Sequence, residues 1–418
     1  MDAASFLNEE LANIEKKLSL QSTSFTFPEF SLVELLSFAA TEEVFFYESK
    51  DENFSFLGLG VSRELETFEI DDFIRKNPNE FLVYYGQFES LNQAVCYVPE
   101  WSFIRKDGKV SLIVRHSEEY QSYSPSNIIF NPNVWESFIG PWISFDETPD
   151  SDEWREMINH SNKLFSKNEL DKIVLSRKKI FTYDSPIEMI VMFREAYKAN
   201  LQSSHFSIYH QINYHESFIS LSPERLFTLK KRELETISLA GSTPRGNTPE
   251  EDAKLESELV SSDKLIREHD FVTTAIKERL SPLTSKIEIS PLMTMKLPYI
   301  QHRQAQIKCT LKEEASIHEL IGLLHPTPAV GGIPYEAAAL KILEIEKGPR
   351  HQYAAPIGVI SKDLSEIVVG IRSASIQGES ITVFGGAGIV SGSVPEEEWI
   401  ETGIKMQPFI KVINKSAI

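Results

Sequence analysis

The sequence predicts an α+β fold in which two layers of antiparallel sheet are flanked by helices. Short apolar runs alternate with turn residues over 205–240 and 357–384, which is typical of antiparallel strands. Capped segments with helical spacing interrupt these runs, and this order favours α+β layers. The sequence has no internal repeat, low-complexity tract or Pro/Gly/Ser-rich linker. We therefore expect one large domain over 1–418, with a divergent part at 1–150 and a motif-bearing part at 151–413.

The N-terminal part is expected to begin with a helix and to continue mostly as sheet. Apolar residues recur at helical spacing from Phe6 to Leu18, so the first 20 residues predict an amphipathic helix. Residues 30–150 are rich in Phe and Tyr and alternate apolar runs with turns. The runs at 103–104 and 110–114 flank Asp107-Gly108, which predicts a hairpin.

The middle of the chain predicts two helices and a series of strands. Ser185-Pro186-Ile187-Glu188 resembles a capping box with proline at the first helical position. A second helix should start at Thr248-Pro249 and run toward Pro282, with a break near Ser261-Ser262. Strands are expected at 172–176, 206–212, 218–221, 226–229 and 234–239.

The C-terminal part predicts strands followed by a last helix. The strands are expected at 357–360, 367–376 and 381–384. The run Gly385-Gly386-Ala387-Gly388 should follow them and let a ligand approach the backbone closely. Ser393 then caps a helix that ends near Ile413.

Composition narrows the classes of partner. The chain carries 42 Lys and Arg against 61 Asp and Glu, a net charge of −19, so nucleic acid and anionic membranes are poor partners. The two cysteines are too few for a disulfide framework or a Cys-rich metal site and fit a reducing, cytoplasmic setting. We expect no signal peptide, because the N-terminus lacks a basic region followed by an apolar run, and no membrane span, because no apolar stretch reaches about 18 residues.

Three carboxylates suggest a metal site. Glu398, Glu401 and Lys405 lie three and four residues apart, on one face of the last helix. A solvated Glu–Lys pair is the commoner explanation of such a face. Glu268, in the 249–280 helix, could complete a two-carboxylate Mg²⁺ site with Glu401. Zinc is not expected, because the sequence has no His/Cys cluster.

Other polar residues stand where either a structural or a chemical role is open. Lys172 at a strand end could reach solvent or, if desolvated, act as a general base. Glu224 could be a turn residue or a general acid. Arg372 in mid-strand needs an anionic partner or an exposed face. Arg245 is in a turn by default, and His325 is a loop histidine without a metal partner. Together these residues fit magnesium-dependent chemistry on a small carboxylated substrate.

Nine motifs in the same order resemble those of the chorismate-utilising enzymes. They are KIVLSR (172–177), SPERLF (222–227), LAGSTPRG (239–246), EHDFV (268–272), HPTPAVGG (325–332), PRHQYAAPIG (349–358), GIRSA (370–374), GGAGIVSGS (385–393) and EEEWIETGIK (396–405). The family includes isochorismate, salicylate, anthranilate and aminodeoxychorismate synthases. The likeness covers about 160–410, and the first 150 residues match only in general character.

The resemblance implies the family's fold, substrate and cofactor. The site would lie between two sheet-and-helix layers, with chorismate as substrate and Mg²⁺ as cofactor. Glu268 and Glu401 would face the metal, and Glu398 would reach it through water. The positions implied around the substrate carboxylates are Tyr353, Arg372, Gly386, Ala387, Gly388 and Lys405, and those implied to line the pocket are Ser242 and His325.

Lys172 determines the subclass that the resemblance implies. Members that add water carry lysine here, which would deprotonate the water that attacks carbon 2, while Glu224 protonates the hydroxyl leaving carbon 4. The resemblance therefore implies an isochorismate synthase, an isomerase serving menaquinone or siderophore biosynthesis, and no glutamine amidotransferase subunit is expected. Salicylate synthase, which goes on to lose pyruvate, is the alternative. Ammonia-using synthases and a non-catalytic chorismate binder fit Lys172 and Glu224 less well.

Three positions depart from the family pattern. Leu265 stands where some relatives have a second glutamate, so fewer water-mediated metal contacts are expected. Ala355 replaces a common glycine, and Ser242 replaces a common threonine. We expect these changes to alter the shape of the pocket without removing a primary role.

Overall fold

The computed structural model describes residues 23–27, 31–36, 41–50, 53–115, 140–201, 205–297, 299–312 and 315–415. The predicted helix over the first 20 residues lies outside these ranges. Within them no helix is both long and apolar enough to cross a membrane.

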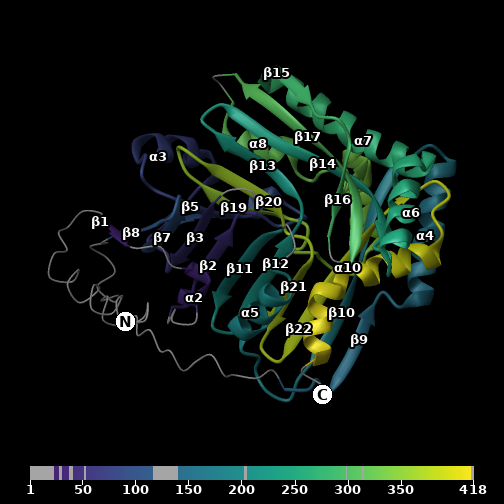
Figure 1. Ribbon diagram of the computed structural model, residues 1–418, viewed down its shortest axis with the longest axis horizontal. Coiled ribbons are helices and arrows are strands. Elements are labelled where there is room, and N and C mark those ends of the chain that lie inside the picture. Colours follow the sequence, from purple (N-terminus) through teal and green to yellow (C-terminus); the bar gives the residue numbers. More distant parts are fainter. Residues whose placement is uncertain are drawn as a thin grey trace.

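The strands form two sheets, and every strand pair that the structure describes is antiparallel, as predicted (Figure 1). In the first sheet the order is β1 (Thr23–Phe27), β8 (Lys109–Val114), β7 (Trp101–Lys106), β3 (Phe54–Leu59), β2 (Val44–Glu48), β11 (Phe206–Asn213), β12 (Glu216–Ser222), β21 (Ser373–Gln377), β22 (Ser380–Val390), β10 (Lys172–Thr182) and β18 (Gly332–Ile333), with β9 (Ser144–Thr148) beside β10. In the second sheet it is β15 (Thr284–Ile289), β17 (Ile300–Leu311), β14 (Glu233–Pro244), β13 (Arg225–Lys230), β20 (Ser365–Val369), β19 (Pro356–Ile360), β5 (Leu82–Tyr85), β6 (Val95–Val98) and β4 (Arg63–Leu65), with β16 (Met293–Lys296) beside β17.

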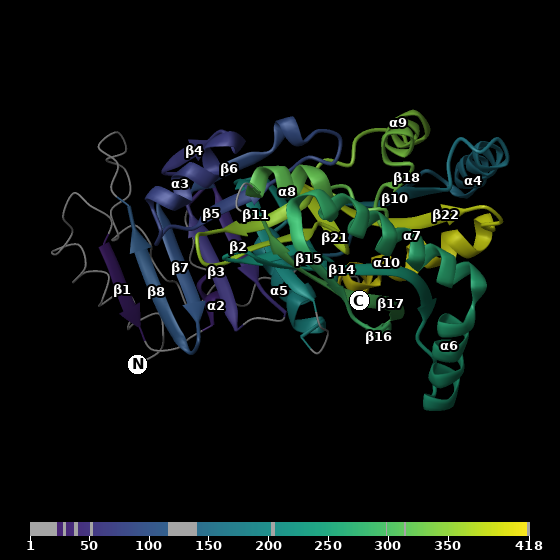
Figure 2. The same cartoon turned by 90° about the horizontal axis from the view of Figure 1, so that it is seen from above.

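Helices cover the outer faces of these sheets. They are α2 (Leu32–Leu35), α3 (Ile70–Lys76), α4 (Ser151–Ser166), α5 (Met189–Ala199), α6 (Pro249–Ser261), α7 (Asp263–Leu280), α8 (Ile317–Leu324), α9 (Tyr335–Ile345) and α10 (Pro395–Lys415), with short 3-10 turns at Thr67–Glu69, Leu91–Gln93 and Ser281–Leu283. Figure 2 shows β1, β8 and β7 at one end of the molecule and α4 and α6 at the other.

The apolar core lies in three layers that match this arrangement. One cluster fills the space between the sheets, where side chains of β2 and β3 meet those of β5 and β19. A second packs α2, α5 and α10 on the first sheet. A third packs α3, α7 and α8 on the second sheet and continues to α4, α9 and the strands β10 and β22 of the first sheet. The predicted α+β architecture of two helix-flanked antiparallel sheets is therefore confirmed.

The chain passes between the two sheets several times, and two of these crossings are adjacent. It leaves β12 for β13 through Pro223-Glu224, and it leaves β20 for β21 through 370–372. The crossings are joined by hydrogen bonds from the Ser222 hydroxyl to the Val369 carbonyl (2.6 Å) and from the Leu221 amide to the Arg372 carbonyl (3.0 Å). Glu224 and Arg372, 148 positions apart in sequence (372 − 224), are thereby placed in one region.

The crossings also correct three strand predictions. The predicted strand 367–376 is two strands in different sheets, and Arg372 lies between them with φ of 49°, not in mid-strand. The four predicted strands between 206 and 239 exist, but β11 and β12 belong to one sheet and β13 and β14 to the other. The glycine run 385–388 is part of β22 and pairs with β10.

Of two predicted helix starts, the structure confirms one and contradicts the other. The predicted helix at Thr248 is confirmed: Thr248 accepts from the Glu251 amide, and a break at Ser262 separates α6 from α7. The prediction that a helix starts with a capping box at Ser185 is wrong, since α5 begins only at Met189. The Ile187 amide instead donates to the Gly378 carbonyl (3.0 Å), which holds the chain beside the β21–β22 turn and delays the helix.

Candidate active site

A cavity of about 650 Å³ opens where the two crossings meet β10, β22, α7 and α10. Ten of the residues predicted for the site line it, namely Lys172, Glu224, Ser242, Glu268, Tyr353, Arg372, Gly386, Gly388, Glu401 and Lys405. They come from both sheets and from two helices. The nine motifs therefore converge on one place although they span more than 200 residues of sequence.

Lys172 is the first residue of β10, and its side chain is only 1% exposed. Its ammonium donates to Glu268 Oε1 of α7 at 3.1 Å. Gly388 of β22 leaves room for this pair: a Cβ there would lie 2.8 Å from Glu268 Oε1 and 3.0 Å from Lys172 Cε. A buried ion pair of this kind is costly to break, because one charge would be left uncompensated.

Glu224 is buried in the crossing between β12 and β13. Burial raises the pKa of its carboxyl to about 7. The Thr327 hydroxyl donates to Glu224 Oε1 at 2.9 Å, and this bond, together with the nearby charges of Lys172 and Lys405, opposes the rise in pKa. A carboxyl with a pKa close to neutrality can both hold and release a proton under physiological conditions, as a general acid must.

The glycine run brings Tyr353 and Lys405 to the wall of the cavity. The Lys405 ammonium contacts Glu401 Oε1 at 2.6 Å and donates to the Gly386 carbonyl at 2.9 Å. Tyr353 stacks on Phe384 with ring centroids 4.9 Å apart, and a Cβ at Gly386 would lie 2.6 Å from the Tyr353 hydroxyl. Glycine is therefore required for this close approach.

His302 is a cavity residue that the sequence did not indicate. It lies in β17, and its ring is within hydrogen-bonding distance of both Ser242 Oγ (2.8 Å) and Arg372 Nη2 (3.1 Å). Thr327 was also missed, although it lies in the predicted HPTPAVGG motif. A histidine in an alternating strand carries no local signal of function, so only the β14–β17 pairing reveals His302.

Three predicted residues lie elsewhere. His325, expected in the pocket, is outside the cavity lining: it is buried and packs edge-on against Phe88 at 5.8 Å. Ala387 is also outside the lining, because successive residues of a strand face opposite sides and its neighbours Gly386 and Gly388 line the cavity. Glu398 lines a second cavity that adjoins the first.

This second cavity, of about 1000 Å³, shares Ser242, Glu268, Gly388 and Glu401 with the first. Glu397 and Glu398 also line it, together with Leu265 at the position that departs from the family pattern. No three His, Cys, Asp or Glu residues of the described chain are already gathered as a metal site. Glu268 and Glu401 are each turned to a lysine instead. The donors are all carboxylate oxygens, a set that fits Mg²⁺ and not zinc.

Arg177 of β10 fixes α10, and with it Glu398, Glu401 and Lys405. Its guanidinium lies 3.5 Å from the centroid of the Trp399 ring. It also donates to the Thr402 hydroxyl (2.6 Å) and to the Trp399 carbonyl (3.1 Å). A planar arginine can make these contacts together, whereas a lysine cannot.

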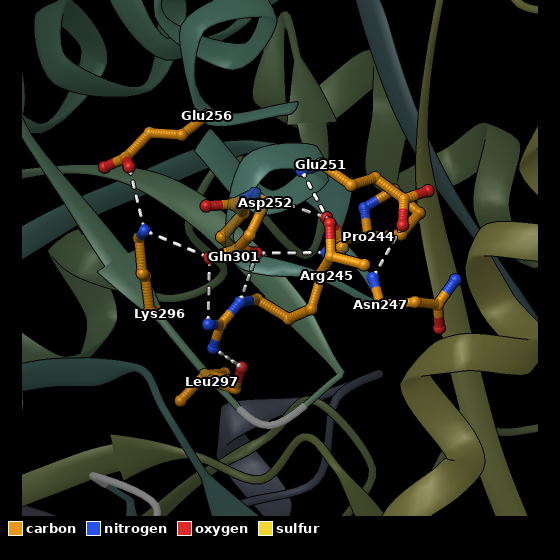
Figure 3. A network of polar contacts seen from close by, with 11 residues as sticks. Pro244, Arg245, Asn247, Glu251, Asp252, Glu256, Lys296, Leu297 and Gln301 are labelled. Atoms are coloured by element: carbon orange, nitrogen blue, oxygen red, sulfur yellow. Dashed lines mark hydrogen bonds and ion pairs between the residues drawn. The ribbon is translucent and has the colours of Figure 1, made fainter. Parts of the chain in front are cut away.

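The sequence did not decide whether Arg245 is a turn residue or a functional residue. In the structure its side chain has a structural role, because it holds neighbouring segments together (Figure 3). It donates from Nε and Nη2 to the two carboxylate oxygens of Asp252 (2.7 and 3.0 Å), and Lys296 contacts the same carboxylate at 3.1 Å. These contacts lower the pKa of Asp252 below its usual value. They join the end of β14, which carries Ser242, to α6 and β16.

Comparisons with known proteins agree with this geometry. Residues 83–414 match the family described as chorismate binding enzyme. The chain is 36% identical over 275 residues to isochorismate synthase MenF of Bacillus subtilis and 33% identical over 253 residues to MenF of Escherichia coli. These alignments cover 65% and 60% of this chain, and in both cases it spans 58% of the relative's length.

Solved structures share the fold. The E. coli menaquinone-specific isochorismate synthase MenF superposes with a TM-score of 0.86 at 24% identity, over 99% of this chain and 100% of that one. DhbC of Bacillus anthracis superposes with a TM-score of 0.76 at 26% identity, over 92% of this chain and 100% of that one. The family match covers most of the chain and includes every residue of the cavity described above. The chain therefore belongs to the chorismate-binding enzyme family.

Proposed function

We propose that this protein is an isochorismate synthase, which isomerises chorismate by adding water at carbon 2 and expelling the hydroxyl at carbon 4. The observation that carries the proposal is the presence of Lys172 and Glu224, both buried, in one cavity. The names of the relatives support it.

In this reaction the two residues exchange protons with water. The neutral amine of Lys172 takes a proton from the attacking water as its oxygen bonds to carbon 2. The carboxylic acid of Glu224 gives its proton to the hydroxyl, which leaves carbon 4 as water while the double bonds shift. One water is consumed and one is released, so the reaction is an isomerisation.

Lys172 can act as a base only after it loses its proton. Its present partner is the Glu268 carboxylate at 3.1 Å, which stabilises the ammonium. We infer that Glu268 and Glu401, which line both cavities, would hold Mg²⁺, with Glu398 reaching it through water. A bound Mg²⁺ would supply positive charge for a substrate carboxylate.

The remaining cavity residues suit a substrate with two carboxylates. Arg372 and Lys405 supply cationic donors, and Tyr353 and Ser242 supply hydroxyls. Since the nucleophile is water, no glutamine amidotransferase subunit is needed to supply ammonia. Cys96 and Cys309 are both buried free thiols, which supports a cytoplasmic location. Isochorismate would then enter menaquinone or siderophore biosynthesis.

Product analysis tests this proposal. Purified protein incubated with chorismate and Mg²⁺ is expected to give isochorismate, and added ammonium salts are expected to give no aminated product. Separation of the products by chromatography decides the outcome. Anthranilate or aminodeoxychorismate as the main product would overturn the proposal, and salicylate with pyruvate would show that the reaction continues past isochorismate.

The pH dependence of kcat/KM is expected to follow the protonation of the Glu224 carboxyl. Because its raised pKa of about 7 keeps the carboxyl protonated below that pH, kcat/KM is expected to fall as the pH rises through about 7. Thr327→Val removes a donor that stabilises the carboxylate, so the pKa should rise and the fall should move to higher pH. Thr327→Ser keeps the donor and should leave the profile in place. Identical profiles for the Val and Ser variants would exclude this role of Thr327.

A further inference from the structure

Ser242, His302 and Arg372 form a chain of polar contacts along one wall of the cavity. His302 Nδ1 lies 2.8 Å from Ser242 Oγ, and His302 Nε2 lies 3.1 Å from Arg372 Nη2. His302 and Arg372 are buried, and all three residues line the cavity. They come from β14, β17 and the β20–β21 crossing, so the contact joins three separate segments.

The hydrogen-bonding capacities of these groups determine where each proton lies. An arginine guanidinium has only donors, so His302 Nε2 must accept. In a neutral imidazole the other nitrogen then carries the hydrogen, and Nδ1–H donates to Ser242 Oγ. The hydrogen of the Ser242 hydroxyl is consequently directed to a different acceptor.

The imidazole is held in its neutral form by its surroundings. Burial lowers the pKa of His302 well below its usual value, and the charges of Arg372, Lys405 and Lys50 act in the same direction. A protonated ring would also place an N–H against Arg372 Nη2, which cannot accept a hydrogen bond.

We propose that His302 is a positioning residue that holds the Arg372 guanidinium in place and makes the Ser242 hydroxyl a donor toward a carboxylate of the bound substrate. Arg372 needs such support, because it lies between β20 and β21 with φ of 49° and its guanidinium is buried, where a polar group needs hydrogen-bond partners. This role rests on the proposed function for the identity of the substrate, but the tautomer itself does not depend on it.

Two variants distinguish the hydrogen bonds that the two ring nitrogens of His302 make. Glutamine at position 302 can place an amide oxygen near the position of Nε2 and accept from Arg372, whereas asparagine is shorter and can place its amide only near Nδ1. We expect His302→Asn to raise KM for chorismate by about 10-fold or more and to change kcat less, since a hydrogen bond to a charged group is lost. His302→Gln should stay within about threefold of the native KM, because the charged bond is kept. Equal effects of the two variants on KM would contradict the proposal.

A measurement on the native protein tests the tautomer directly. In protein labelled with ¹⁵N-histidine, the ring signals that disappear in His302→Gln belong to His302. They are expected to show a neutral Nδ1–H tautomer that does not titrate between pH 6 and 8. An Nε2–H tautomer or an imidazolium would overturn the proposal. Because this readout needs no turnover, a protein that makes no isochorismate but shows the Nδ1–H tautomer would reject the proposed function and keep the arrangement around His302.

Discussion

Replacing Glu224 with glutamine is expected to lower kcat by at least about 10²-fold, the usual contribution of a general acid. Glutamine has nearly the size of glutamate. Its carbonyl oxygen can still accept a hydrogen bond from the Thr327 hydroxyl, which lies 2.9 Å from Glu224 Oε1 in the native protein. The variant therefore keeps the packing of the crossing and loses only the proton that the leaving hydroxyl needs. Lys172→Ala should lose turnover to a similar extent because the base is gone.

The two variants should differ in stability. Glu224 takes part in no ion pair within the described residues and its carboxyl is protonated below a pH of about 7, so below that pH the unfolding midpoint of Glu224→Gln should stay close to that of the native protein. Lys172→Ala leaves Glu268 without its present partner and should lower the midpoint. Steady-state rates with chorismate and thermal unfolding followed by circular dichroism give both quantities. Turnover close to the native rate in either folded variant would remove that residue from the mechanism.

Periodicity and motif order were enough to predict the fold class and most of the cavity. Strand and helix signals are local, and β10, β22, α7 and α10 all form where those signals stand. The nine motifs, taken in order, then identified ten residues that line one cavity in the structure. The motifs predict the cavity well because they contain residues needed for the backbone as well as residues needed for their side chains. One example is Gly388, where a side chain would collide with the Lys172–Glu268 pair.

The failures concern long-range pairing. Nothing local within 367–376 indicates that the chain changes sheets, because the crossing depends on contacts with β12 and its following turn. His302 was missed and His325 was misplaced for the same reason: a histidine's neighbours in space are set by strand register and loop packing. Ala387 was misplaced because the glycine run was expected to follow the last strand, whereas it belongs to β22, in which successive residues face opposite sides.

Chelation of Mg²⁺ is expected to abolish activity, and excess Mg²⁺ is expected to restore it. Glu268 and Glu401 come from separate helices and line both adjoining cavities, so each can offer an oxygen to the same ion. In the structure each carboxylate is paired with a lysine, Glu268 with Lys172 at 3.1 Å and Glu401 with Lys405 at 2.6 Å. These lysines compete with a metal ion for the two carboxylates, and a site with few protein ligands should be weak without substrate.

Chorismate should strengthen metal binding, and the metal should strengthen chorismate binding by the same factor. A substrate carboxylate can complete the shell of the ion, and Lys405 and Arg372 remain near to balance its charge. Titration calorimetry of Mg²⁺ with and without chorismate measures this factor. Equal Mg²⁺ affinities in the two titrations would exclude the coupling.

Glutamine variants separate a metal ligand from a surface ion pair. Glu401→Gln and Glu268→Gln each remove one charge beside a dication while keeping the size of the side chain, so each should reduce Mg²⁺ affinity and turnover more than stability. The double variant should be little worse than either single variant, because both act through one ion. If Glu401 instead served only as the helix partner of Lys405, Glu401→Gln would change stability by no more than about 0.5 kcal/mol and leave the kinetics intact. Calorimetry on the single variants distinguishes these cases, and unchanged Mg²⁺ affinity in both would leave the surface ion pair as the explanation of Glu401.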